Sequence, residues 1–150
     1  MTAMIEESTL RILNSKGHTI GTGFLASKTL VVTCAHVVIR AGLDGENKLR
    51  VQFTGAKQPI IVTALGQFED LKRDVAILKL ESIPDGIQPL SMGLAEHSRP
   101  GNTFRSFGYA TAAELQGIFA NGTVDGYQRE HKLVQLQSAQ ANHGMSGAVW

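Results

Sequence analysis

Short apolar segments separated by turn residues occupy the first half of this chain. Such segments, either alternating in polarity or continuously apolar, are typical of β-strands. We expect six of them, at 9–13, 18–25, 29–33, 49–53, 59–65 and 74–80. Residues 37–41 leave room for about one helical turn before Gly42. Six strands in so short a stretch, with almost no helix, favour a small closed β-barrel.

The second half begins with a linker and contains further strands. Residues 83–90 carry two prolines and a glycine, which is typical of a connection. Three more strands are expected, at 104–109, 117–127 and 133–138, with the start of a fourth at 148–150, and the second of them is expected to break at Asn121 and Gly122. We therefore divide the chain into a first barrel at 1–82, a linker at 83–90 and a second barrel at 91–150.

The composition argues against several classes of protein. Hydrophobic residues make up 43% of the chain and charged residues 18%, as in a globular protein. The net charge is only +1 and the basic residues are scattered, so we expect neither a nucleic-acid nor a membrane partner. No apolar run approaches the ~20 residues of a membrane helix, and the first residues do not resemble a signal peptide. Cys34 is the only cysteine, so no internal disulfide can form and a cytoplasmic location is expected.

Three polar residues follow one another along the chain in the order histidine, aspartate and serine. His36 ends one expected strand, Asp74 begins another, and Ser146 lies in a loop after the last. A serine hydroxyl is a weak nucleophile unless a base takes its proton, and a histidine held by a carboxylate suits that role. This order is one of the few in which such a triad is built, and it points to acyl transfer. Asp70 is a rival carboxylate, but no apolar strand follows it directly.

Glycines on both sides of Ser146 suit a loop that carries a nucleophile. Gly144 and Gly147 permit positive φ angles, so the backbone can turn its amides toward one point. The amides of Gly144 and Ser146 would then form an oxyanion hole, which stabilises the charge that develops during attack.

Four segments resemble motifs of the trypsin-like, or chymotrypsin-fold, serine peptidases. They are Gly21-Thr22-Gly23-Phe24-Leu25, Thr33-Cys34-Ala35-His36, Asp74-Val75-Ala76-Ile77-Leu78 and Gly144-Met145-Ser146-Gly147-Ala148. The compact, disulfide-free form is similar to the intracellular bacterial and HtrA-type members. The resemblance implies an all-β fold, a double six-stranded Greek-key barrel, with His36 and Asp74 in the first barrel and Ser146 in the second. It also implies hydrolysis of a protein or peptide substrate through an acyl-enzyme, without metal or cofactor.

The same resemblance assigns a substrate pocket and shows two departures. Gln140 corresponds to the base of the primary specificity pocket and is not acidic, so a preference for arginine or lysine is not expected. His143 is a further candidate for substrate contact. Ala148 replaces a glycine of the family motif. The family continues beyond the nucleophile, so we expect the second barrel to be incomplete at the C-terminus and the chain to belong to a larger regulated protein, with C-terminal domains or a partner chain.

Two other functions stay open. A peptidase-like module without activity, used to bind proteins, is consistent with the missing pocket strands. An esterase or acyl transferase would use the same triad, although α/β-hydrolases place their histidine last.

Structural roles are expected for the other residues of chemical interest. Cys34 is expected to pack as a small residue. The remaining histidines lack metal-ligand spacing: His18, His97 and His131. Four aromatic residues are expected in the core of the second barrel: Phe104, Phe107, Tyr109 and Phe119. Four glycines are expected at turns or bulges: Gly101, Gly108, Gly117 and Gly122.

Overall fold

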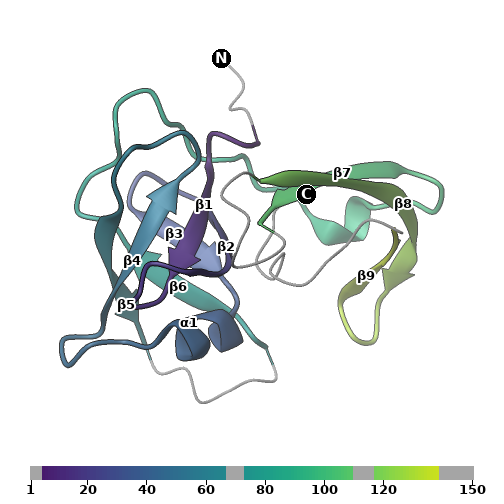
Figure 1. Cartoon of the computed structure of the whole chain (residues 1–150). Coiled ribbons are helices and arrows are strands. Elements are labelled where there is room, and N and C mark those ends of the chain that lie inside the picture. Colours follow the sequence, from purple (N-terminus) through teal and green to yellow (C-terminus); the bar gives the residue numbers. More distant parts are fainter. Residues whose placement is uncertain (1–4, 67–72, 110–116, 139–150) are drawn as a thin grey trace.

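Two antiparallel β-sheets make up most of the regular structure in the computed structural model, which describes residues 5–66, 73–109 and 117–138 (Figure 1). The first sheet contains β1 (Thr9–Leu13), β2 (Thr19–Leu25), β3 (Leu30–Thr33), β4 (Lys48–Phe53), β5 (Ile60–Leu65) and β6 (Ala76–Lys79). The second contains β7 (Thr103–Gly108), β8 (Ile118–Gln128) and β9 (Leu133–Gln137). The described helical segments are α1 (Ala35–Ala41) and the 3₁₀ turn η1 (Ala95–His97).

The first sheet closes into a six-stranded barrel in the order β1-β2-β3-β6-β5-β4. β1 closes the barrel because it pairs with both β2 and β4, so that Ile12 lies opposite Gly21 on one side and Val51 on the other. Closure removes the exposed edges that an open sheet would present. The prediction of an all-β fold with a closed six-stranded barrel and an incomplete second sheet is confirmed.

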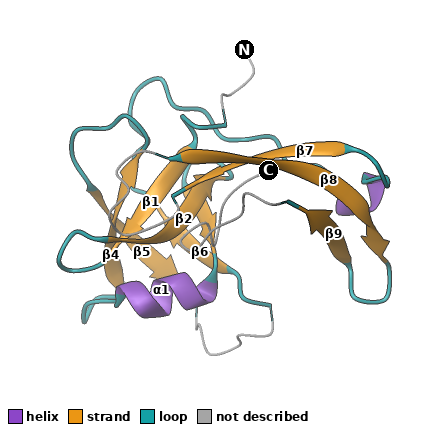
Figure 2. Ribbon diagram, turned by 45° about the vertical axis from the view of Figure 1, so that its right-hand side comes forward, coloured by secondary structure: helices purple, strands orange, loops and turns teal. Residues whose placement is uncertain are grey.

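Aliphatic side chains that alternate along the strands fill the barrel. In β4, Leu49, Val51 and Phe53 are buried, and the residues that alternate with them are only half-buried. Helix α1 covers one end of the barrel and contributes Val37 and Val38 to the same core (Figure 2). Each such aliphatic side chain contributes roughly 1.5–3 kcal/mol when it leaves water. The core therefore holds α1 against the barrel, where the helix contacts β1 and β2.

The pairing of β3 with β6 brings two distant parts of the chain together. In this antiparallel pair, Thr33 lies opposite Ala76 and Leu30 lies opposite Lys79. The residues that follow β3 consequently lie beside the residues that precede β6. His36 and Asp74 both belong to this end of the barrel.

The long strand β8 runs through Gly122 without a break. Gly122 lies opposite Phe104, and a Cβ atom built on it would be 2.1 Å from the Gln137 backbone oxygen and 2.6 Å from the Phe104 ring. The expected break is therefore wrong, because this glycine allows close approach of neighbouring strands instead of a turn. The pairing of β8 with β9 shifts further along, between Val124 and Gly126.

Tyr109 joins the second sheet to the barrel. Its side chain is buried, and its backbone N–H donates to Oγ1 of Thr22 at 3.0 Å. Its hydroxyl is hydrogen-bonded to Oγ1 of Thr54, which in turn donates to the Thr9 carbonyl oxygen at 2.9 Å. Phe107 packs edge-to-face against the Tyr109 ring, with centroids 5.9 Å apart. Tyr109 thus lies at the junction of the first lobe (the barrel) and the second lobe (the sheet β7-β8-β9), whereas the sequence pattern predicts it in the core of the second barrel.

The segment between the two lobes is hydrogen-bonded to the barrel. The Ser8 hydroxyl donates to the Gln88 carbonyl oxygen, and the Leu90 N–H donates to the Leu25 carbonyl oxygen at 3.0 Å. These bonds limit how freely the segment can move where it leaves the first lobe. In the part of the chain that the structure describes, no helix has the length and apolar character needed to cross a membrane.

Candidate active site

His36 lies in the first turn of α1, immediately after β3. Cys34 is the N-cap residue of α1 and has an extended backbone, with φ −86° and ψ 143°. The chain therefore turns sharply from strand to helix at this point, and the helix is held there by its buried residues Val37 and Val38. The backbone N–H of Ala35 donates to the carbonyl oxygen of Asp74 at 3.2 Å. This bond connects the start of α1 to the chain that leads into β6.

Asp74 has a left-handed backbone conformation, with φ 48°. Aspartate adopts this conformation more readily than most residues, but it still costs of order 1–3 kcal/mol when the surroundings impose it. The carboxylate compensates with two hydrogen bonds from one residue. The backbone N–H of His36 donates to Oδ1 at 2.9 Å, and Nδ1 of His36 lies 2.6 Å from Oδ2. The left-handed turn is thus the conformation in which Asp74 holds both the backbone and the ring of His36.

The environment keeps the Asp74 carboxyl ionised. Its side chain is 35% exposed and that of His36 is 36% exposed. Partial burial raises the pKa of the Asp74 carboxyl, but the hydrogen bonds from the backbone and ring of His36 lower the pKa further, so that the net pKa is below its usual 3.8. An ionised carboxylate accepts the proton on Nδ1, which selects the tautomer whose Nε2 is free to accept another proton. The pair therefore has the form of a general base with its orienting acid.

The other predicted site residues lie outside the described residues. They are Gln140, His143, Gly144 and Ser146, together with the rival carboxylate Asp70. The structure thus brings together two of the three predicted triad members, and the nucleophile, the oxyanion hole and the substrate pocket stay predictions.

Cys34 is the residue near this site that the sequence pattern did not single out for a role in it. It is half-buried, and its sulfur lies within 4.8 Å of the ligand atoms of both His36 and Asp74. In the sequence, the short spacing between Cys34 and His36 is a weak indication that the two side chains lie close together. The contribution of Asp74 follows only from the pairing of β3 with β6.

Two hollows of the described surface lie away from this pair. One of 440 Å³ is lined by residues of β1, β4 and the loop after α1. Another, of 420 Å³, lies at the junction of the lobes beside Arg11 and Tyr109. Neither is lined by His36 or Asp74. We identify the candidate site by the hydrogen-bond geometry of His36 and Asp74.

Comparison with known proteins gives a family and a fold. A family model described as trypsin-like peptidase domain matches residues 21–150. The crystal structure of Deg5 is similar, with a TM-score of 0.71 and 23% sequence identity over 95% of this chain and 73% of that one. A serine endoprotease from Yersinia pestis has a TM-score of 0.69 and 20% identity over 96% of this chain and 49% of its own. This chain thus spans about half of the latter protein. Comparison with curated proteins gives no significant match.

Proposed function

The chain belongs to the trypsin-like peptidase domain family, and on that premise we propose that it is a serine endopeptidase domain in which His36, Asp74 and Ser146 form the triad. The observation that supports this most strongly is the 2.6 Å contact between Nδ1 of His36 and Oδ2 of Asp74. Two residues 38 positions apart are joined there by ring and backbone hydrogen bonds together. A solvated surface pair has no reason to adopt that double contact.

The proposed reaction begins with the free nitrogen of His36. Nε2 takes the proton of the Ser146 hydroxyl as that oxygen attacks the scissile carbonyl carbon, and the amides of Gly144 and Ser146 stabilise the resulting oxyanion. The imidazolium formed in this step is stabilised by the Asp74 carboxylate. It then gives its proton to the leaving amine as the peptide C–N bond breaks. Water, deprotonated by His36 in the same way, releases the acyl group and restores the serine.

The proposed substrate is a protein or peptide, with no preference for arginine or lysine at the cleavage site. Gln140, at the expected base of the specificity pocket, offers an amide and no negative charge to pair with arginine or lysine. His143 is placed by the same proposal at the edge of the pocket, in contact with substrate. We further propose a cytoplasmic location, supported by the presence of a single cysteine in the sequence.

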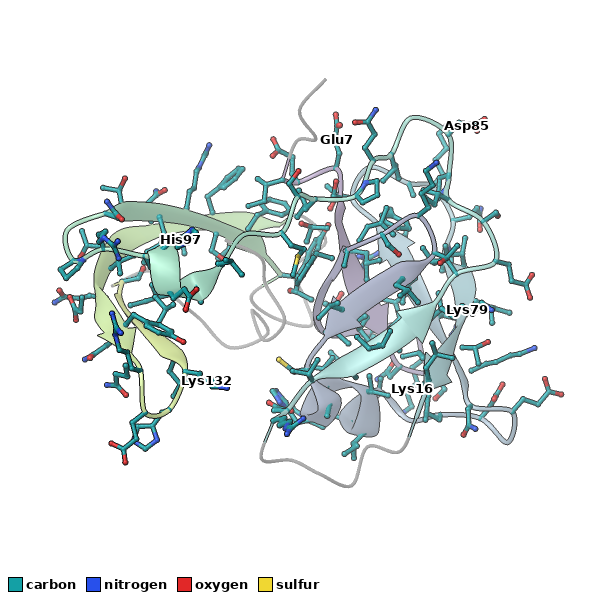
Figure 3. The ribbon with its side chains drawn as sticks, turned by 180° about the vertical axis from the view of Figure 1, so that it is seen from behind. Glu7, Lys16, Lys79, Asp85, His97 and Lys132 are labelled. Carbon is teal, nitrogen blue, oxygen red and sulfur yellow. The ribbon has the colours of Figure 1, made fainter. Side chains whose placement is uncertain are left out.

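Hydrolysis of a dye-quenched, unfolded casein by the purified full chain tests the proposal. Wild-type protein is expected to release fluorescence, and Ser146→Ala and His36→Ala are each expected to lower the rate by at least about a thousandfold. The matched control is His97→Ala, because this exposed histidine lies on the second lobe and leaves the pair untouched (Figure 3). Hydrolysis that survives both triad substitutions would contradict the assignment, and a folded wild-type protein without any hydrolysis would favour a binding module.

A further inference from the structure

Three side chains with metal-binding atoms lie together at the start of α1. The sulfur of Cys34, a ring nitrogen of His36 and a carboxylate oxygen of Asp74 all lie within 4.8 Å of one another. Each of the three side chains is only partly buried. The cluster is therefore reachable by a small ion from solvent.

From this geometry we infer that Cys34, His36 and Asp74 form an inhibitory site for Zn²⁺ or a similar thiophilic divalent ion. The donor set of sulfur, nitrogen and oxygen suits zinc, whereas magnesium and calcium prefer ligands that are all oxygen. Three protein ligands leave a fourth position for water, which is the usual arrangement of an open zinc site.

The adjustment needed to bind an ion is small. Zinc lies about 2.0–2.3 Å from its nitrogen, oxygen and sulfur ligands, so the ligand atoms of a tetrahedral site are about 3.5 Å apart. Nδ1 of His36 and Oδ2 of Asp74 are 2.6 Å apart and must separate slightly to bind an ion between them. The Cys34 sulfur lies within 4.8 Å of the ligand atoms of the other two residues and must move closer to them. Cys34 is the N-cap residue of α1 and His36 lies in its first turn, and Asp74 is held by its backbone bond to Ala35. Side-chain rotations of partly exposed groups are therefore sufficient.

Metal binding would convert Nε2 of His36 from a proton acceptor into a hydrogen-bond donor. When the ion occupies Nδ1, the proton that Nδ1 carried moves to Nε2, and the thiol proton is released to solvent. Nε2 then faces the nucleophile with a hydrogen in place of a lone pair, and it can no longer take the serine proton. The inhibitory part of this inference rests on the proposed peptidase function, whereas the binding part does not.

Titration of the metal-free full chain with Co²⁺ tests the binding part. The expected result is one equivalent of bound ion with a thiolate-to-cobalt charge-transfer band in the near ultraviolet, which is lost in Cys34→Ala and competed away by Zn²⁺. His36→Ala is expected to weaken binding by at least about tenfold, and His97→Ala to leave it unchanged. Circular dichroism of each variant checks folding, and Cys34→Ser is the replacement if Cys34→Ala does not fold. A band that survives loss of Cys34, or the absence of any band in the wild-type protein, would overturn the inference.

Two further measurements separate this inference from the proposed function. ¹⁵N NMR of the His36 ring is expected to show the proton moving from Nδ1 to Nε2 on addition of Zn²⁺, and no such movement would overturn the switch. Zn²⁺ is also expected to stop casein hydrolysis by the wild-type protein reversibly, with a chelator restoring it, and to require at least about tenfold more metal in Cys34→Ala. Equal inhibition of both proteins would overturn the inhibitory role. Cobalt binding in a protein without hydrolysis would contradict the proposed function and leave the metal site standing.

Discussion

The carboxylate of Asp74 holds His36 at two points, accepting a hydrogen bond from its backbone N–H at 2.9 Å and lying 2.6 Å from Nδ1 of its ring. One carboxylate thereby fixes both the start of α1 and the orientation of the imidazole. Asp74 makes both contacts from a left-handed backbone conformation, just before β6 at the end of the barrel where β6 pairs with β3. The orientation of the His36 ring and the local fold thus depend on the same carboxylate.

Replacement of Asp74 by asparagine is expected to reduce kcat by about 10⁴-fold with a much smaller effect on KM. The amide can donate a hydrogen to Nδ1, which selects the tautomer whose Nε2 already carries a proton. Steady-state kinetics of Asp74→Asn on a peptide substrate measure the effect. Asp44→Asn is the control, because Asp44 caps the loop before β4 and accepts hydrogen bonds from Glu46 and Lys48. A loss of less than about tenfold in Asp74→Asn would rule out the orienting role.

The stabilising contribution of Asp74 is expected to disappear in acid. Its pKa is lower in the folded protein than the usual 3.8, so the contribution is fully present above 3.8 and is lost as the pH falls through the folded-state value. The unfolding free energies of wild type and Asp74→Asn are therefore expected to differ more at about pH 5 than at about pH 2.5. Urea titrations at both pH values measure this. A difference that stays constant would mean that the carboxylate is not held in its ionised form.

Tyr109→Phe is expected to lower the unfolding free energy by about 0.5–1.5 kcal/mol. The substitution keeps the buried ring and removes the hydroxyl that bonds to Thr54 of the barrel. Tyr127→Phe is the matched control, because Tyr127 lies half-buried in β8. Urea denaturation followed by circular dichroism gives both values. Equal values for the two variants would show that the hydroxyl of Tyr109 does not help to join the lobes.

Gly122→Ala is expected to destabilise the second sheet by about 1–3 kcal/mol, and Gly126→Ala by much less. A Cβ at Gly122 would be 2.1 Å from the Gln137 backbone oxygen, whereas at Gly126 the nearest neighbour is a Pro100 side-chain atom 4.0 Å away. Both glycines lie in β8, so differences in strand propensity cancel. Hydrogen exchange of the β8 and β9 amides measures the effect on this sheet directly. A larger loss of protection in Gly126→Ala would contradict the packing argument.

The barrel was predictable because its signals are local. Strands such as Thr9–Leu13 and Lys48–Phe53 are bounded by turn residues, and their polarity follows the period of a strand. That His36 and Asp74 form a pair was predictable only from the order of residues and the family motifs. Their contact itself depends on the pairing of β3 with β6, which no local pattern specifies.

Three features were not predictable for the same physical reason. Tyr109 follows an apolar strand of the second lobe, yet its hydroxyl is bonded to Thr54 of the first. The sequence around Gly122 predicts a break in the strand, and only the fold shows that the Gln137 backbone packs closely against this glycine. Cys34 gains its neighbour Asp74 only when β3 and β6 pair. Each depends on a contact between residues far apart in sequence.

Mass spectrometry of the full chain after reaction with a fluorophosphonate probe shows whether Ser146 is the nucleophile, because the probe bonds only to a serine whose proton is removed by a working base. A single adduct is expected on the peptide that contains Ser146, absent from Ser146→Ala and from His36→Ala, and strongly reduced in Asp74→Asn. An adduct on another serine, or one that forms at an equal rate without His36, would contradict it.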